Sequence, residues 1–196
     1  MEITLSEPHI LKMTHHDGET SVGGSQEWYE DKWQKASGCG PVAASNLIWY
    51  KTRPQGGKDR YVEIMKEMFT YITPSIRGVN TSAIFTGGIV GYGTDNGLQI
   101  TPKVLEIRPK PFMRPGIGTV HSFILSALKS DAPVAFLNLS HGALEDLENW
   151  HWVTIIAFNN ETGIAEISDY GKVLYIDITQ WLDKSMLGGA MVYLAP

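Results

Sequence analysis

Apolar side chains recur every three or four residues along several stretches of the chain, a spacing that places them on one face of an α-helix. The strongest pattern covers 61–72, and its apolar residues are Tyr61, Ile64, Met65, Met68, Phe69 and Ile72. Weaker patterns predict helices over 41–50, 81–92 and 120–128. Gly87 and Gly88 weaken the pattern at 81–92, because glycine is a poor helix former.

After these helices the chain changes to short apolar runs that are typical of β-strands. The predicted strands are 134–139, 151–158, 163–168, 173–178 and 190–195. Turn signals rich in Asn, Asp and Gly separate consecutive runs at 159–163 and 169–172. Partial alternation over 98–107 predicts one more strand, and Pro102 places it at a sheet edge or a break.

The remaining stretches carry no regular pattern. Residues 1–38 are predicted to form an extended lead-in with loops, and the three prolines within 108–115 predict a loop there. Neither an internal repeat nor a linker interrupts the sequence. We therefore expect a single domain over residues 1–196 with an α+β fold, in which helices come first and mainly antiparallel strands follow.

Composition narrows the class of protein. The length of 196 residues suits one domain, and the net charge of −5 argues against a dedicated nucleic-acid binder. No apolar run approaches the roughly 18 residues of a membrane span. The N-terminus also lacks the basic head and apolar run of a secretory signal. The sequence thus predicts a cytoplasmic protein that binds neither nucleic acid nor a membrane.

The chain has one cysteine, Cys39, so no internal disulfide can form. Cys39 stands between Gly38 and Gly40, directly before the helix predicted from Pro41. Glycines permit close approach of a ligand to the backbone, and the start of a helix stabilises a thiolate through its free N–H groups. A lone cysteine can also be a small apolar residue in the core. The glycine-flanked setting favours a nucleophile.

A thiol nucleophile needs a base, and His151 is the strongest candidate among the six histidines. It opens the predicted buried strand 151–158, where an imidazole requires a polar partner. Asp169 ends the next predicted strand, and a hairpin turn would bring the two residues together. The alternatives are that His151 is a core-edge histidine and that Asp169 caps its own turn.

Two further clusters point to less specific roles. His15, His16 and Asp17 lie together near the N-terminus, but they lack a companion cysteine and the spacing of zinc ligands. No metal site is therefore expected there. The segment 145–148 carries three carboxylates that are predicted to lie in a solvated loop, although they could flank a cleft.

Three segments in this order resemble the papain-like cysteine peptidase superfamily, in particular the bacterial peptidases that remove double-glycine leaders. The segments are 38–44, 150–155 and 167–169, and the resemblance spans roughly residues 24–178. It implies a papain-like fold, with N-terminal helices packed on a mainly antiparallel sheet. It also implies a hydrolase in which Cys39 attacks a peptide or acyl substrate, His151 transfers the proton and Asp169 orients His151. No metal or organic cofactor is implied.

The resemblance further implies that a glutamine upstream of the cysteine helps to bind the oxyanion, together with the Cys39 backbone N–H. Gln34 stands five residues before Cys39, whereas Gln26 stands thirteen before it, and the spacing favours Gln34. Two other functions stay open. An acyltransferase of the same fold would pass the acyl group to an amine, and a non-catalytic binding module would keep only the fold.

Overall fold

The computed structural model describes residues 1–109 and 111–196, and within them it shows an α+β architecture. Its six α-helices are α1 (Lys32–Ser37), α2 (Cys39–Thr52), α3 (Lys58–Tyr71), α4 (Ser82–Asp95), α5 (Ile117–Lys129) and α6 (Ile178–Lys184). The strands of the main sheet are β1 (Glu2–Thr4), β4 (Pro102–Ile107), β5 (Val134–Asn138), β6 (His151–Asn159), β7 (Ile164–Asp169), β8 (Lys172–Asp177) and β9 (Gly189–Leu194). A separate small sheet pairs β2 (Lys12–Thr14) with β3 (Thr20–Val22).

The main sheet is antiparallel at every described pairing. Its strands follow the order β4-β9-β5-β6-β7-β8, and β1 pairs with the end of β6. Pro102 is the first residue of β4, which lies at the sheet edge as its sequence predicts. The predicted strands and the mainly antiparallel arrangement are therefore confirmed, with end points that differ by at most one residue except at 98–107, where the strand begins at Pro102.

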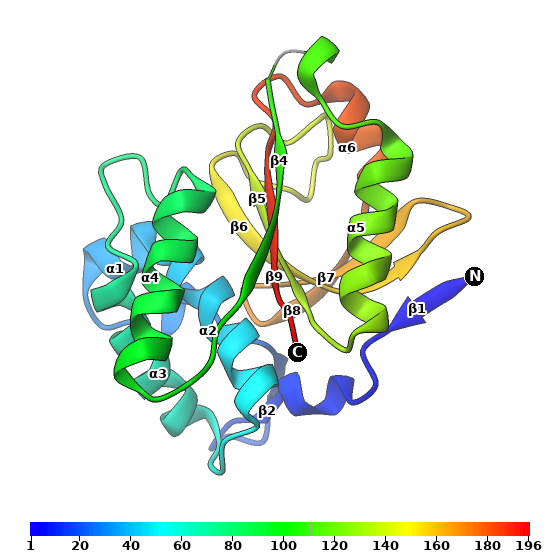
Figure 1. Cartoon of the computed structure of the whole chain (residues 1–196). Coiled ribbons are helices and arrows are strands. Elements are labelled where there is room, and N and C mark those ends of the chain that lie inside the picture. The colour runs from blue at the N-terminus through cyan, green and yellow to red at the C-terminus, as the bar shows by residue number, and fades with distance from the viewer. Residues whose placement is uncertain (110) are drawn as a thin grey trace.

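The helices divide into two groups around the sheet. Figure 1 shows α1, α3 and α4 gathered on one side, with α2 between them and the strands and α5 lying along the sheet. Every residue of α2 from Cys39 to Tyr50 is buried, because α3 covers one of its sides and β6 another. A helix buried on all sides has no polar stripe, which explains why its sequence pattern is weak.

The N-terminal 38 residues are more ordered than their sequence predicts. The segment holds β1, β2, β3, α1 and two 3₁₀ helices, Pro8–Leu11 and Gln26–Trp28. Strands of three residues are too short to show a period, so the expectation of an extended lead-in was wrong. The predicted loop at 108–115 contains a further 3₁₀ helix, Pro111–Met113, while residue 110 lies outside the described residues.

The helix α6 was also missed by sequence reasoning. The predicted strand 173–178 stops at Asp177, whose side chain accepts a hydrogen bond of 2.9 Å from the Gln180 N–H and so caps α6. An acidic residue followed three positions later by glutamine is a signal for a helix start. This signal was available in the sequence.

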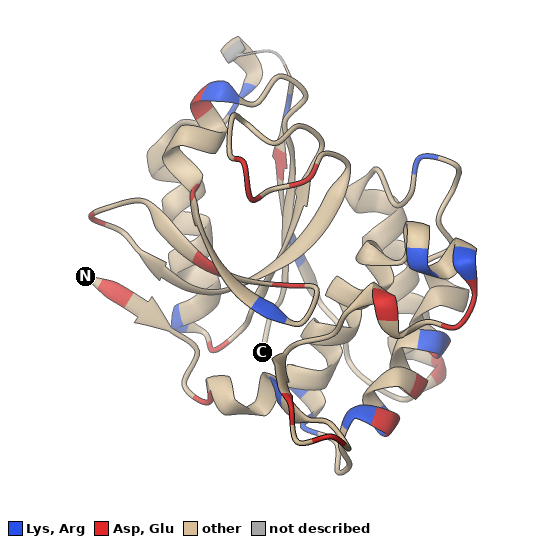
Figure 2. Cartoon of the chain, turned by 180° about the vertical axis from the view of Figure 1, so that it is seen from behind, with Lys and Arg blue, Asp and Glu red and all other residues tan. Residues whose placement is uncertain are grey.

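Acidic and basic residues are interspersed on the helical side of the molecule (Figure 2). Several form ion pairs at the surface, such as Arg60 with Glu63 at 2.8 Å and Lys66 with Glu30 at 2.9 Å. Exposed pairs of this kind contribute little to stability. Among the described residues, no helix combines the length and apolar character needed to cross a membrane.

The neighbouring glycines of α4 should respond oppositely to alanine. A Cβ at Gly87 meets nothing within 4 Å, so Gly87→Ala should stabilise the fold by about 0.5–1 kcal/mol through helix propensity. A Cβ at Gly88 would collide with Ile72 Cγ1 and lie 2.7 Å from the Tyr71 carbonyl oxygen, so Gly88→Ala should destabilise it. Urea unfolding of the two variants measures both effects. A shift of the same sign in both would contradict this packing.

Candidate active site

Cys39 is the first residue of α2, and the residue is 8% exposed. Gly38 is the N-cap residue of α2 and has no side chain that could accept a hydrogen bond from the first N–H groups of the helix. A Cβ at Gly40 would lie 2.8 Å from Val79 Cβ, and one at Gly38 would collide with the Gln34 carbonyl oxygen. The glycines were expected to admit a ligand. The structure shows that the space beside them is filled by protein atoms.

His151 and Asp169 meet at one end of a β-hairpin. His151 begins β6 and Asp169 ends β7, and the two strands pair with Thr154 opposite Ser168. The His151 Nε2 atom lies 2.7 Å from Asp169 Oδ1, and the two residues are only 4% and 7% exposed. The hairpin that the turn at 159–163 predicts therefore brings these two candidate residues together. The Asp169 carboxylate contacts the imidazole.

Cys39 and Asp169 both act on the charge of His151. Burial by itself lowers the pKa of His151, but hydrogen bonds with Asp169 and Cys39, and the negative charges of both, raise it to about 10. The ordinary value is about 6.5. The imidazole therefore holds its proton at neutral pH and faces two groups that can carry negative charge.

Tyr170 is a fourth member of this cluster that sequence reasoning treated only as part of a turn. Its backbone adopts the left-handed conformation with φ 47°, which is uncommon for a residue with a side chain. Its ring stacks on the His151 ring at a centroid distance of 5.3 Å and an angle of 14°. An aromatic face stabilises a nearby cation. The position of Tyr170 directly after Asp169 is the one signal that could have identified it.

The structure brings Gln26, rather than Gln34, to the cluster. Gln26 begins a 3₁₀ helix and lines the same cavity as Cys39 and His151. Gln34 lies in α1, where its backbone N–H is capped by Asp31, and it is not among the residues that line this cavity. The sequence spacing favoured Gln34, but this residue lies in α1 and does not line the cavity. The segment before α1, which carries Gln26, folds back onto α2.

A buried polar network fixes the segment that carries Gln26. The Asn46 side chain of α2 accepts hydrogen bonds from the Gly24 N–H at 3.0 Å and the Tyr61 hydroxyl at 2.6 Å, and it donates one to Thr154 Oγ1 at 2.9 Å. Ser168 donates a further bond of 2.6 Å to the Val22 carbonyl. The network joins α2, β6 and β7 to the N-terminal segment. An asparagine inside an apolar helix was its only sequence signal.

An open cleft of about 640 Å³ leads from the surface to Cys39 and His151. Its other lining residues include Gln26, Ile76, Arg77, Glu148, Asn149 and Trp150. Ile76 is 93% exposed at the tip of a turn closed by two backbone hydrogen bonds between Ser75 and Gly78, and Trp150 is 43% exposed beside His151. Two large apolar side chains are thus available for contact with a bound molecule. Of the 145–148 carboxylates, Glu148 flanks the cleft, as the sequence analysis allowed.

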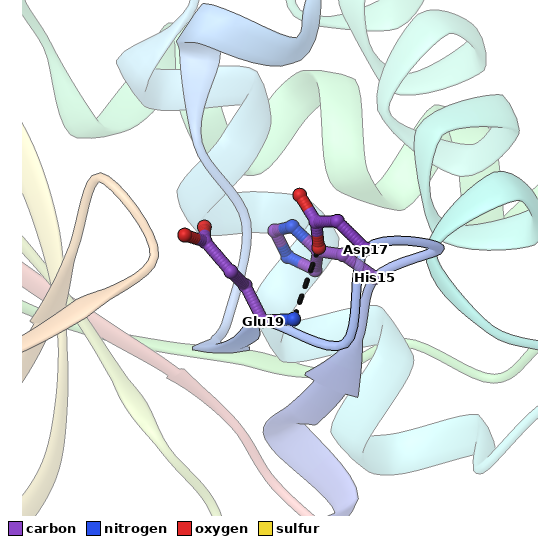
Figure 3. Close-up of side chains that lie close together, drawn as sticks. All are labelled: His15, Asp17 and Glu19. Carbon is purple, nitrogen blue, oxygen red and sulfur yellow. Dashed lines mark hydrogen bonds between the residues drawn. The ribbon is translucent and has the colours of Figure 1, made fainter.

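Among the described residues, one group has the composition of a metal site: His15, Asp17 and Glu19, whose ligand atoms lie within 4.8 Å of one another. These residues form the β2–β3 hairpin, where Asp17 Oδ1 accepts a bond of 2.9 Å from the Glu19 N–H (Figure 3). The His15 nitrogens already contact Ser21 Oγ at 3.0 Å and the Lys58 ammonium at 3.4 Å. The hairpin explains the cluster, and the neighbouring Lys58 opposes a second cation.

Two comparisons with known proteins found no match. No protein-family model matches the chain. No curated protein matches it either.

Proposed function

We propose that this protein is a cysteine-dependent hydrolase with a papain-like arrangement, and specifically a peptidase. One observation carries the proposal. A lone cysteine at the start of a buried helix lines the same cleft as a buried histidine whose pKa it helps to raise, and a buried aspartate lies 2.7 Å from that histidine. A nucleophile, a base and an orienting group gathered in one cleft are the arrangement that nucleophilic catalysis requires.

The proposed reaction begins with the Cys39 thiolate paired with the His151 imidazolium. The sulfur attacks the carbonyl carbon of a peptide bond, and the electron pair of the carbonyl moves to its oxygen. As the carbonyl re-forms, the C–N bond breaks and His151 gives its proton to the departing amine, which leaves a thioester on Cys39. Water then attacks the thioester carbon, His151 takes a proton from that water, and the C–S bond breaks. The products are a carboxylic acid and the restored pair of Cys39 thiolate and His151 imidazolium.

The residues around the cysteine supply the remaining parts of this mechanism. The Cys39 backbone N–H and the Gln26 side-chain amide would donate hydrogen bonds to the oxyanion. Asp169 keeps the ring of His151 in one orientation and stabilises its positive charge. The walls formed by Ile76 and Trp150 suit an extended peptide that crosses the cleft.

Acylation of the thiol tests the proposal. Incubation with a nitrophenyl ester should release one equivalent of nitrophenolate in a burst and leave a transient thioester on Cys39, detected by mass spectrometry. Cys39→Ala should abolish the burst. His151→Ala keeps the thiol and should slow acylation by about 10²-fold or more, because the thiol loses the base that takes its proton.

The matched control is the urea-unfolded protein, in which Cys39 has the same sequence neighbours but no histidine partner. If the folded protein is acylated no faster than the unfolded one, or if the thioester forms and is never hydrolysed, a hydrolase mechanism is ruled out. Adding a small amine to the reaction separates hydrolysis from acyl transfer by the product formed.

A further inference from the structure

A chain of hydrogen bonds runs from the rim of the cleft to the candidate oxyanion donor. The Tyr170 hydroxyl lies 3.2 Å from Glu148 Oε2, and Gln26 Nε2 lies 3.3 Å from the same hydroxyl. Glu148 and Gln26 both line the cleft that reaches Cys39. Since Tyr170 also stacks on His151, one side chain connects the histidine, the glutamine and the carboxylate.

We infer that Glu148 and Tyr170 are positioning residues that fix the orientation of the Gln26 amide, so that its N–H group and not its oxygen is presented to the oxyanion. This inference rests on the proposed function of Gln26. It is based on the direction in which the two hydrogen bonds of Tyr170 must run, and on the Gln26 Oε1 atom, which has no partner among the described residues.

The direction of these hydrogen bonds follows from which atoms can donate and which can only accept. An ionised carboxylate can only accept, so Tyr170 must donate its single hydroxyl proton to Glu148. The Tyr170 oxygen can then only accept from Gln26, and Nε2 is the only side-chain atom of Gln26 that can donate. A side-chain amide has two N–H bonds. One is used by Tyr170, and the second remains for a substrate oxygen.

The Oε1 atom of Gln26 indicates that the surrounding residues impose this orientation on the amide. Gln26 Oε1 is buried and has no hydrogen-bond partner among the residues that the structure describes. Burying an acceptor without a partner costs free energy. Without Glu148, the Tyr170 proton would be free to bind Oε1, and the amide would be free to turn over. Its oxygen would then repel the negative charge that forms in the reaction.

The test compares two reactions of the same thiol in the full chain. Acylation by a nitrophenyl ester passes through an oxyanion, whereas alkylation by iodoacetamide displaces iodide at a saturated carbon and forms none. Glu148→Leu and Tyr170→Phe should each slow acylation about 3- to 10-fold, as expected for the loss of one hydrogen bond. The rate of alkylation should stay the same. Tyr170→Phe keeps the ring that stacks on His151.

Conservative and neighbouring variants provide the controls. Glu148→Gln offers an amide oxygen to the Tyr170 hydroxyl, so it should recover most of the acylation rate that Glu148→Leu loses. Glu145→Leu removes a nearby carboxylate for which the described part of the chain shows no hydrogen bond, and acylation should be as fast as in the wild type. A structural role of the loop alone would slow alkylation as well.

The possible results separate the inference from the proposed function. If the wild type is acylated but Glu148→Leu and Tyr170→Phe react equally fast, the positioning role is wrong and the hydrolase stands. If alkylation falls in parallel with acylation, the variants act on the thiol, and the positioning role is again wrong. If the wild type is not acylated, the proposed function fails. The side-chain amide resonances of Gln26 then still test the chain of hydrogen bonds, because they should shift in Tyr170→Phe.

Discussion

Replacing Asp169 by alanine should slow the acylation of Cys39 at neutral pH by about 10²- to 10⁴-fold. His151 is 4% exposed and loses the partner that lies 2.7 Å from its Nε2 atom. Burial lowers the pKa of His151, and Asp169 is one of the two groups that raise it. Without the carboxylate the pKa of His151 therefore falls from about 10. The imidazole is then no longer held in the orientation in which it takes the proton of the Cys39 thiol. Nitrophenolate release in the burst phase measures the change.

The same substitution lowers the free energy of unfolding by an amount that depends on pH. Because folding raises the pKa of His151 from 6.5 to about 10, the folded chain binds this proton more tightly than the unfolded chain. The resulting stabilisation is complete below about pH 6.5 and is lost as the pH rises through about 10. The difference in unfolding free energy between the wild type and Asp169→Ala should therefore shrink between about pH 6 and pH 10.

Asp169→Asn is the matched control, because it keeps an oxygen that can accept from His151 but removes the negative charge. Its acylation rate and the pKa of His151, followed by NMR titration, should fall between those of the wild type and Asp169→Ala. An unchanged His151 pKa in both variants would show that Asp169 has no electrostatic effect on the imidazole.

Replacing Gln26 by alanine should slow acylation by about 10²- to 10³-fold, which is the usual loss when one oxyanion donor is removed. The rate of alkylation by iodoacetamide should not change, since that reaction forms no oxyanion. The difference between the two rates is the measurement. It distinguishes a loss of oxyanion binding from a loss of thiol reactivity.

Gln34→Ala is the control that decides between the two glutamines. Gln34 is the choice that residue spacing favours, but it does not line the cleft. The variant should therefore be acylated at the wild-type rate. If Gln34→Ala loses the rate and Gln26→Ala keeps it, the cleft geometry around Gln26 has no bearing on the reaction.

Helices with one buried face, and hairpins with a clear turn signal, were predictable from the sequence. The helix at 61–72 and the hairpin that joins His151 to Asp169 both show a clear alternation between apolar and polar positions or a clear turn signal. The helix α2 lies between two layers and carries no such alternation, so the sequence signal for it over 41–50 was weak. Of the three-residue strands in the N-terminal segment, β1 depends on pairing with the distant β6, which no local pattern records, and β2 and β3 form a hairpin whose strands are too short to show a period.

The candidate site divides in the same way. Cys39, His151 and Asp169 could be found because each stands at the end of a predictable helix or strand. Gln26 could not be chosen over Gln34, since its place depends on the network around Asn46, which joins residues more than 100 positions apart. Tyr170 and Glu148 meet only because two loops pack together. Contacts between loops leave no periodic trace in a sequence.

The bond from Ser168 to Val22 spans 146 residues and belongs to the network that holds the N-terminal segment against the sheet. Contacts between such distant parts of a chain form late in folding, because closing a long loop is entropically costly before other contacts repay it. The nucleophile, the hairpin and the glutamine segment come from three separate parts of the chain. We therefore expect the enhanced reactivity of the single thiol to return last on refolding, so that the chain acquires a reactive cysteine only once it is fully native.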